Sequence, residues 1–72
     1  MIRGYQVDVR RLAAQLGGGF VAHVPALKGC IADGETRDEA IRNLEDAIGC
    51  WLAVAEEQGR PVPVPAIAAH IH

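Results

Sequence analysis

The chain has 72 residues, of which 50% are hydrophobic, 22% charged and only 4% aromatic. This balance is typical of a globular domain and excludes a disordered tail, while the short length argues against a deep substrate pocket with a catalytic apparatus. The net charge of −2 disfavours unaided nucleic-acid binding and suits a basic protein partner.

No apolar run is long enough for a secretory signal or a membrane-spanning helix. The two cysteines are therefore expected to be free thiols in a reducing compartment. We expect a cytoplasmic protein with a single domain over residues 1–72.

Three short strands are predicted in the first half of the chain, because apolar and polar residues alternate or cluster between turn residues. They lie at Tyr5–Val9, Phe20–Val24 and Cys30–Ala32. Residues 10–16 form either a short helical turn or a continuation of the first strand. The three glycines at 17–19 predict a turn, and Pro25 ends the second strand. Short connections favour an antiparallel meander.

A capping box predicts the start of a long helix. Thr36 would accept a hydrogen bond from the Glu39 amide, and the Glu39 side chain would reach back to the Thr36 amide. Apolar residues then recur at spacings of three and four on one helical face. They are Ala40, Ile41, Leu44, Ala47, Ile48, Trp51, Leu52 and Ala55. Gly59 and Pro61 stop the helix, which we expect at about Arg37–Gln58.

These elements predict an α+β fold, β-β-β-α-β, with a three-stranded antiparallel meander and one long helix packed on one face. The prolines of residues 61–65 force an extended path, and residues 66–72 form either a short fourth strand or a frayed tail. Val21 and Ile31 point away from the helix. The uncovered sheet face and a free strand edge predict self-association or a protein partner.

Nucleophilic groups are few. The chain has no serine, so Cys30 and Cys50 are the candidate nucleophiles, and His23, His70 and His72 are the imidazoles available as a base. We expect Cys30 to be a small buried packing residue. Cys50 lies on the polar side of the predicted helix, where it is either exposed or buried between subunits.

Metal ligands are also weakly indicated. His70 and His72, with His23, would hold a transition metal, but no ligand spacing supports such a site. A cluster of carboxylates at the helix start would suit Mg²⁺, although cap and dipole roles explain it better. It consists of Asp33, Glu35, Asp38 and Glu39. We expect no catalytic residue, no cofactor and no metal.

A series of short motifs runs along residues 5–65. It comprises Val24-Pro25, Leu27-Lys28-Gly29-Cys30, Gly34 through Ala40, Ala47-Ile48, Trp51-Leu52 and Gly59 through Pro65. In order and spacing the series resembles the HicB family, the antitoxins of HicA–HicB modules. We interpret its motif residues as structural: Pro25, Gly29, Cys30, Gly34, Thr36, Glu39, Ala40, Trp51, Gly59 and Pro63.

The resemblance implies a partial ribonuclease-H-like fold without the catalytic carboxylates. It also implies an antitoxin that binds and neutralises a small basic HicA-type toxin, an mRNA-cleaving ribonuclease, and that self-associates. Longer family members add a DNA-binding domain; only seven residues follow Pro65, so we expect no direct DNA binding. The alternatives are a homo-oligomeric domain of other function and a metal-dependent hydrolase or nuclease on the same frame.

Overall fold

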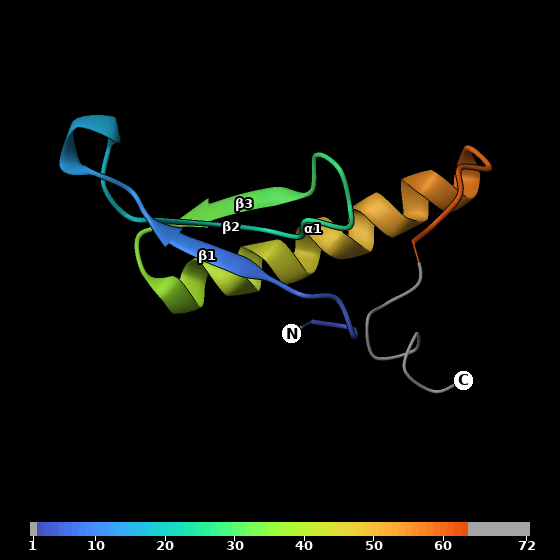
Figure 1. Cartoon of the computed structure of the whole chain (residues 1–72), viewed down its shortest axis with the longest axis horizontal. Helices are drawn as coiled ribbons and strands as arrows, with labels where there is room; N and C mark the ends of the chain where they lie inside the picture. The colour runs from blue at the N-terminus through green and yellow to red at the C-terminus, as the bar shows by residue number, and fades with distance from the viewer. Residues whose placement is uncertain (1, 64–72) are drawn as a thin grey trace.

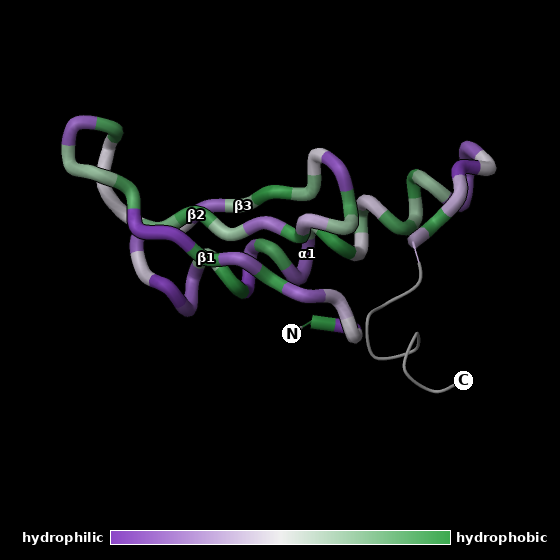
Figure 2. Tube along the Cα trace, viewed as in Figure 1, coloured by the Kyte–Doolittle hydropathy of each residue, from purple (hydrophilic) through white to green (hydrophobic). Residues whose placement is uncertain are grey.

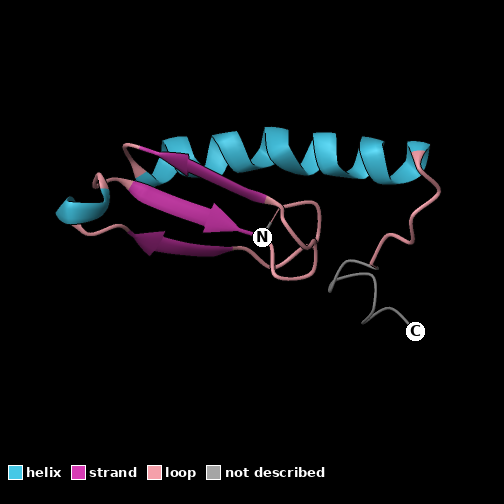
Figure 3. Ribbon diagram, turned by 90° about the horizontal axis from the view of Figure 1, so that it is seen from above, coloured by secondary structure: helices cyan, strands magenta, loops and turns pink. Residues whose placement is uncertain are grey.

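The computed structural model describes residues 2–63, which form a three-stranded sheet, one short 3-10 helix and one long α-helix (Figure 1). The elements are β1 (Asp8–Arg11), η1 (Ala14–Leu16), β2 (Phe20–His23), β3 (Ile31–Gly34) and α1 (Arg37–Glu57). The sheet is antiparallel with β2 in the centre. Figure 3 shows α1 beside the sheet and extending past its end. The predicted α+β meander with one long helix is confirmed.

β1 lies further along the chain than the predicted Tyr5–Val9. Its pairing with β2 runs from Asp8 opposite His23 to Arg11 opposite Phe20. Tyr5 instead forms an isolated bridge with Ile2 and is buried, and its hydroxyl donates a 2.6 Å hydrogen bond to the carbonyl oxygen of Pro63. The alternation from Tyr5 onward indicates which side chains are buried. It does not show where the ladder begins.

The segment after Val9 combines both predicted alternatives. Arg10 and Arg11 complete β1, and Ala14–Leu16 form the helical turn η1. The glycine turn follows as predicted, and the Leu12 N–H donates to the Gly19 carbonyl at 2.9 Å. β3 begins at Ile31, one residue after the predicted start, because the Cys30 N–H is directed to the Leu27 carbonyl of the preceding loop.

α1 begins at the predicted cap. The Glu39 N–H donates to Thr36 Oγ1 at 3.1 Å. The reciprocal bond differs from the prediction: Glu39 Oε1 accepts from the Glu35 N–H at 3.2 Å, and not from Thr36. The carboxylate thus satisfies the amide one residue earlier, which still ties the β3–α1 connection to the first helical turn.

α1 ends at Glu57, one residue before the predicted end. Gly59 adopts φ +68°, and its N–H donates to the Glu56 carbonyl. The Arg60 N–H donates to the Ala55 carbonyl at 2.8 Å. These two bonds form a Schellman motif, in which glycine takes the left-handed conformation at low cost. The predicted fourth strand lies outside the described residues.

The core lies between α1 and the inner sheet face. Figure 2 shows hydrophobic and hydrophilic residues alternating along α1, and its buried side chains face mainly β3 and β2. The buried residues are Tyr5, Ala22, Val24, Leu27, Cys30, Ala40, Leu44, Ile48 and Ala55. The opposite sheet face carries no covering element among residues 2–63. Within residues 2–63, no helix is both long and apolar enough to cross a membrane.

Candidate functional site: an acidic helix face, an uncovered sheet face and an apolar groove

Acidic side chains are concentrated in one half of the chain. Eight of the nine Asp and Glu residues lie between Asp33 and Glu57, whereas four of the seven basic residues precede residue 30. Five of these acidic residues lie exposed on α1, and we call them the acidic helix face. They are Asp38, Glu45, Asp46, Glu56 and Glu57. Exposed carboxylates in this number attract a basic partner at long range.

A polar hollow lies where β3 meets the start of α1. Its carboxylates are those of Asp33, Glu35 and Glu39, and the glycines at 17–19 form its other wall. Asn43 Nδ2 donates a 2.7 Å hydrogen bond to the Asp33 carbonyl oxygen at its edge. Glu39 is already engaged by the Glu35 amide. Within residues 2–63 no three His, Cys, Asp or Glu side chains are placed to hold a metal ion.

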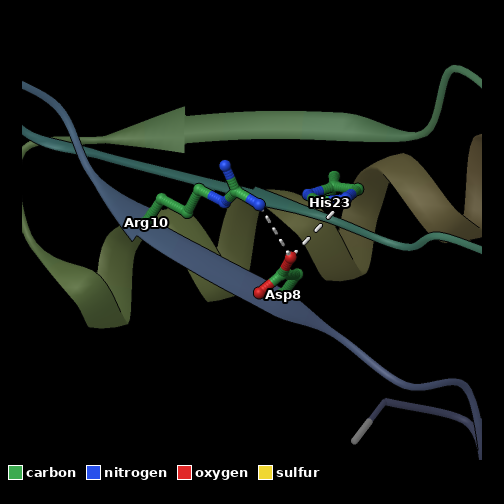
Figure 4. Close-up of polar contacts among 3 residues, drawn as sticks. All are labelled: Asp8, Arg10 and His23. Carbon is green, nitrogen blue, oxygen red and sulfur yellow. Dashed lines mark ion pairs between the residues drawn. The ribbon is translucent and has the colours of Figure 1, made fainter.

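The uncovered sheet face carries an exposed ion pair. Asp8 Oδ2 lies 3.8 Å from Arg10 Nη2 and 3.9 Å from His23 Nε2, on the side of the sheet away from α1 (Figure 4). All three side chains are at least one-third exposed, so the pairing contributes little stability. Ile31 lies opposite His23 on this face and is 59% exposed.

Cys30, a candidate nucleophile, and His23, a candidate base, lie on opposite sides of the sheet. His23 points outward with Ile31, whereas Cys30, one residue before Ile31, is buried in the core. A Cys30–His23 catalytic pair is therefore not assembled. Burial also raises the pKa of the Cys30 thiol, which disfavours the reactive thiolate. His70 and His72 lie outside the described residues.

An apolar groove of about 320 Å³ runs between the start of β3 and the second half of α1. Its lining includes Cys30, Ile31, Cys50, Trp51, Val54 and Arg60. Cys50 is exposed, and Val54 is 45% exposed. Trp51 Nε1 donates a 2.9 Å hydrogen bond to the Lys28 carbonyl oxygen and so holds the β2–β3 loop against the helix. Sequence reasoning missed this groove, because its residues come from a strand and a helix that meet only in the fold.

The predicted motif residues are distributed over the whole fold. Cys30 and Ala40 lie in the core, Trp51 lines the groove, and Gly34 sits so close to α1 that a Cβ would lie 2.5 Å from the Ala40 nitrogen. Pro25 and Gly29 belong to the β2–β3 loop, where Gly29 has φ +84°. The hydrogen bonds at the start of α1 involve Thr36 and Glu39, and those at its end involve Gly59. The carbonyl oxygen of Pro63 accepts from Tyr5. We propose that these residues shape the fold and take no part in chemistry.

Relatives of the chain are found in bacteria and archaea. The chain is 44% identical over 46 residues to the UPF0150 protein ssl0259 of Synechocystis, covering 64% of this chain and 63% of that protein. It is 40% identical over 52 residues to the UPF0150 protein ssr1765 of the same organism, covering 72% and 66%. A UPF0150 protein of Thermoplasma acidophilum is 35% identical over 46 residues, covering 64% and 67%. The chain thus spans less than two thirds of the length of the two Synechocystis proteins.

A family model gives the broader assignment. Residues 5–72 match the model described as the HicB_like antitoxin of bacterial toxin–antitoxin systems. No solved structure matches the chain. The family match covers nearly the whole sequence and agrees with the motif series of residues 5–65. The chain therefore belongs to the HicB-like antitoxin family.

Proposed function

We propose that this chain is a non-catalytic antitoxin that binds and neutralises a small basic HicA-type toxin through the acidic helix face. The family assignment supports an antitoxin role. We choose this surface because the acidic residues are unevenly distributed. Eight of the nine lie in the half of the chain that forms β3 and α1.

Electrostatic complementarity explains how such binding would neutralise the toxin. A ribonuclease that cleaves mRNA holds the phosphate backbone with Lys and Arg side chains. The acidic helix face presents Glu45, Glu56 and their neighbours as exposed carboxylates on a rigid helix. These carboxylates compete with RNA phosphates for the same basic surface, so toxin bound to α1 no longer holds its substrate. The proposal places both proteins in the cytoplasm, where mRNA is available.

Charge reversal on α1 tests the surface. In the double variant Glu45→Lys/Glu56→Lys, two carboxylates of the acidic helix face become cations. Both side chains are exposed, so the fold is expected to persist. Calorimetric titration with a HicA-type toxin at low salt should show affinity at least about tenfold below that of the unaltered chain, and the difference should shrink at high salt.

A matched control separates local from overall charge. The triple variant Gln6→Lys/Asp8→Lys/Gln15→Lys changes the net charge equally, because Asp→Lys counts for two charges and each Gln→Lys for one. All three positions lie outside α1. The control should bind nearly as well as the unaltered chain. An equal loss in both variants would contradict the chosen surface, and no binding by the unaltered chain would contradict the function.

A further inference from the structure

The acidic helix face has a cation in its midst. Arg42 is exposed on α1, four residues after Asp38. Glu45 and Asp46 follow it by three and four residues. Residues at these spacings lie on the same side of a helix, with their Cβ atoms about 5–6 Å apart. Arg42 therefore lies among three of the carboxylates that make up this face. The other basic residue of α1, Arg37, is its first residue and lies at the end of the face.

The guanidinium of Arg42 is not neutralised by these neighbours. Within residues 2–63, the ion pairs are those that Asp8 makes with Arg10 at 3.8 Å and with His23 at 3.9 Å. In this part of the chain, no carboxylate of α1 is thus paired with Arg42. A purely local role, in which an ion pair along the helix would stabilise α1, does not account for this cation.

The backbone that presents Arg42 is held in place on both sides. The neighbouring Asn43 bonds the carbonyl oxygen of Asp33 through Nδ2 at 2.7 Å. Further along α1, Trp51 Nε1 bonds the carbonyl oxygen of Lys28 at 2.9 Å. Both bonds join α1 to the sheet or to its loop. A charge on a backbone that is already fixed can select a partner, because little order has to be acquired on binding.

A basic partner that docks on α1 meets Arg42 together with the carboxylates. A cation of the partner opposite Arg42 would repel it at close range and weaken the complex. An uncharged group there would strip water from the guanidinium without replacing it, which is also unfavourable. A carboxylate within the basic surface removes both penalties. Arginine is moreover enriched among the residues that dominate the affinity of protein interfaces.

We propose that Arg42 is a specificity-determining residue of the acidic helix face and pairs with a carboxylate embedded in the basic surface of the toxin. This inference rests on the proposed function, because it describes the partner of the same face. The carboxylates of α1 attract any basic protein at long range. Arg42 then favours a partner with an acidic residue at the matching place and disfavours a uniformly cationic one.

The sign of the effect of Arg42→Glu separates this proposal from attraction by overall charge. The substitution makes the chain more acidic by two charges, so overall charge alone would tighten the binding of a basic toxin. We expect instead that the affinity for a HicA-type toxin falls at least about tenfold in calorimetric titration. The loss should persist at high salt, because a pair enclosed in an interface is screened less than exposed charges.

Two further variants of Arg42 separate the lost pair from new repulsion within the helix. Arg42→Gln adds no carboxylate beside Asp38 and Glu45, and it should also weaken toxin binding. Arg42→Lys keeps the positive charge and should weaken it less than Arg42→Gln does, although lysine lacks the planar fork of arginine.

A matched control and a second probe complete the test. Arg11 is exposed on β1, whereas α1 packs mainly against β3 and β2. Arg11→Glu changes the net charge as much as Arg42→Glu and should leave toxin affinity nearly unchanged. Poly-L-lysine has no side-chain carboxylate, so it should bind Arg42→Glu more tightly than the unaltered chain.

The possible results distinguish this inference from the function on which it rests. Toxin binding that is unchanged or tighter in both Arg42→Glu and Arg42→Gln would overturn the role of Arg42 and leave the antitoxin function intact. Weaker binding of poly-L-lysine by Arg42→Glu would also overturn it, because the loss would then come from a damaged helix. An unaltered chain that binds no HicA-type toxin would contradict the proposed function and this inference with it.

Discussion

Trp51 Nε1 donates a hydrogen bond of 2.9 Å to the carbonyl oxygen of Lys28, which joins the second half of α1 to the β2–β3 loop. The indole is half-buried against the core, so it contributes both packing and a specific bond. Trp51→Phe keeps most of the packing and should lower the free energy of unfolding by about 1 kcal/mol. Trp51→Ala also removes the packing and should cost roughly 3 kcal/mol in urea melts. Equal costs for the two variants would show that the packing contributes nothing, and a Trp51→Phe variant as stable as the unaltered chain would show the same of the bond.

The helix cap at Thr36 should contribute measurably to stability. Thr36→Ala removes the acceptor of the Glu39 N–H and should lower the free energy of unfolding by about 1 kcal/mol. Thr36→Ser keeps the hydroxyl and serves as the control, with a change near zero. If both substitutions had the same effect in chemical denaturation, the loss would come from the threonine methyl group and not from the cap.

Two glycines should respond in opposite directions to alanine. At Gly34 a Cβ would lie 2.5 Å from the Ala40 nitrogen, a backbone atom that cannot move without shifting α1. Gly34→Ala should therefore destabilise the fold by about 1–3 kcal/mol. At Gly49, inside α1, the nearest atom is Arg3 Nη2 at 3.7 Å. Gly49→Ala should stabilise by about 0.5–1 kcal/mol, because glycine is a poor helix former. Thermal melts that ranked the two alike would refute the close approach of β3 and α1.

The two cysteines should differ in reactivity and in their effect on pH dependence. Burial raises the pKa of the Cys30 thiol above its ordinary value of 9.0, whereas Cys50 is exposed. The folded chain therefore holds the Cys30 proton more tightly than the unfolded chain does, and its contribution to stability is lost as the pH rises above 9.0. Cys30→Ala should unfold with a shallower loss of stability than the unaltered chain in this alkaline range. At neutral pH, a maleimide should label Cys50 long before Cys30.

The long helix was predictable because its signals are local. The capping box, the spacing of apolar residues and Gly59 predict α1 to within one residue of its observed end. β1 was misplaced because Tyr5 is buried without belonging to the ladder. Alternation in the sequence follows burial, and hydrogen bonding between strands depends on a distant partner that the local pattern does not contain.

The candidate surfaces were predictable only in part. Val21 and Ile31 were correctly expected to point away from α1, since a strand turns alternate side chains to opposite faces. The apolar groove could not be anticipated from the sequence. Cys30 and Cys50 line it together only because α1 packs against β3 in the folded chain. The charge segregation, in contrast, was present in the sequence and required only that acidic residues be counted by segment.

Inhibition of RNA cleavage tests the proposed function most directly. A HicA-type toxin is incubated with a labelled mRNA and increasing amounts of the chain at low salt, and the remaining cleavage is measured. The unaltered chain should stop cleavage near an equimolar ratio, and Glu45→Lys/Glu56→Lys should require an excess of at least about tenfold. Cleavage that continues in excess unaltered chain would contradict neutralisation of the toxin, and equal inhibition by the double variant would contradict binding through the acidic helix face.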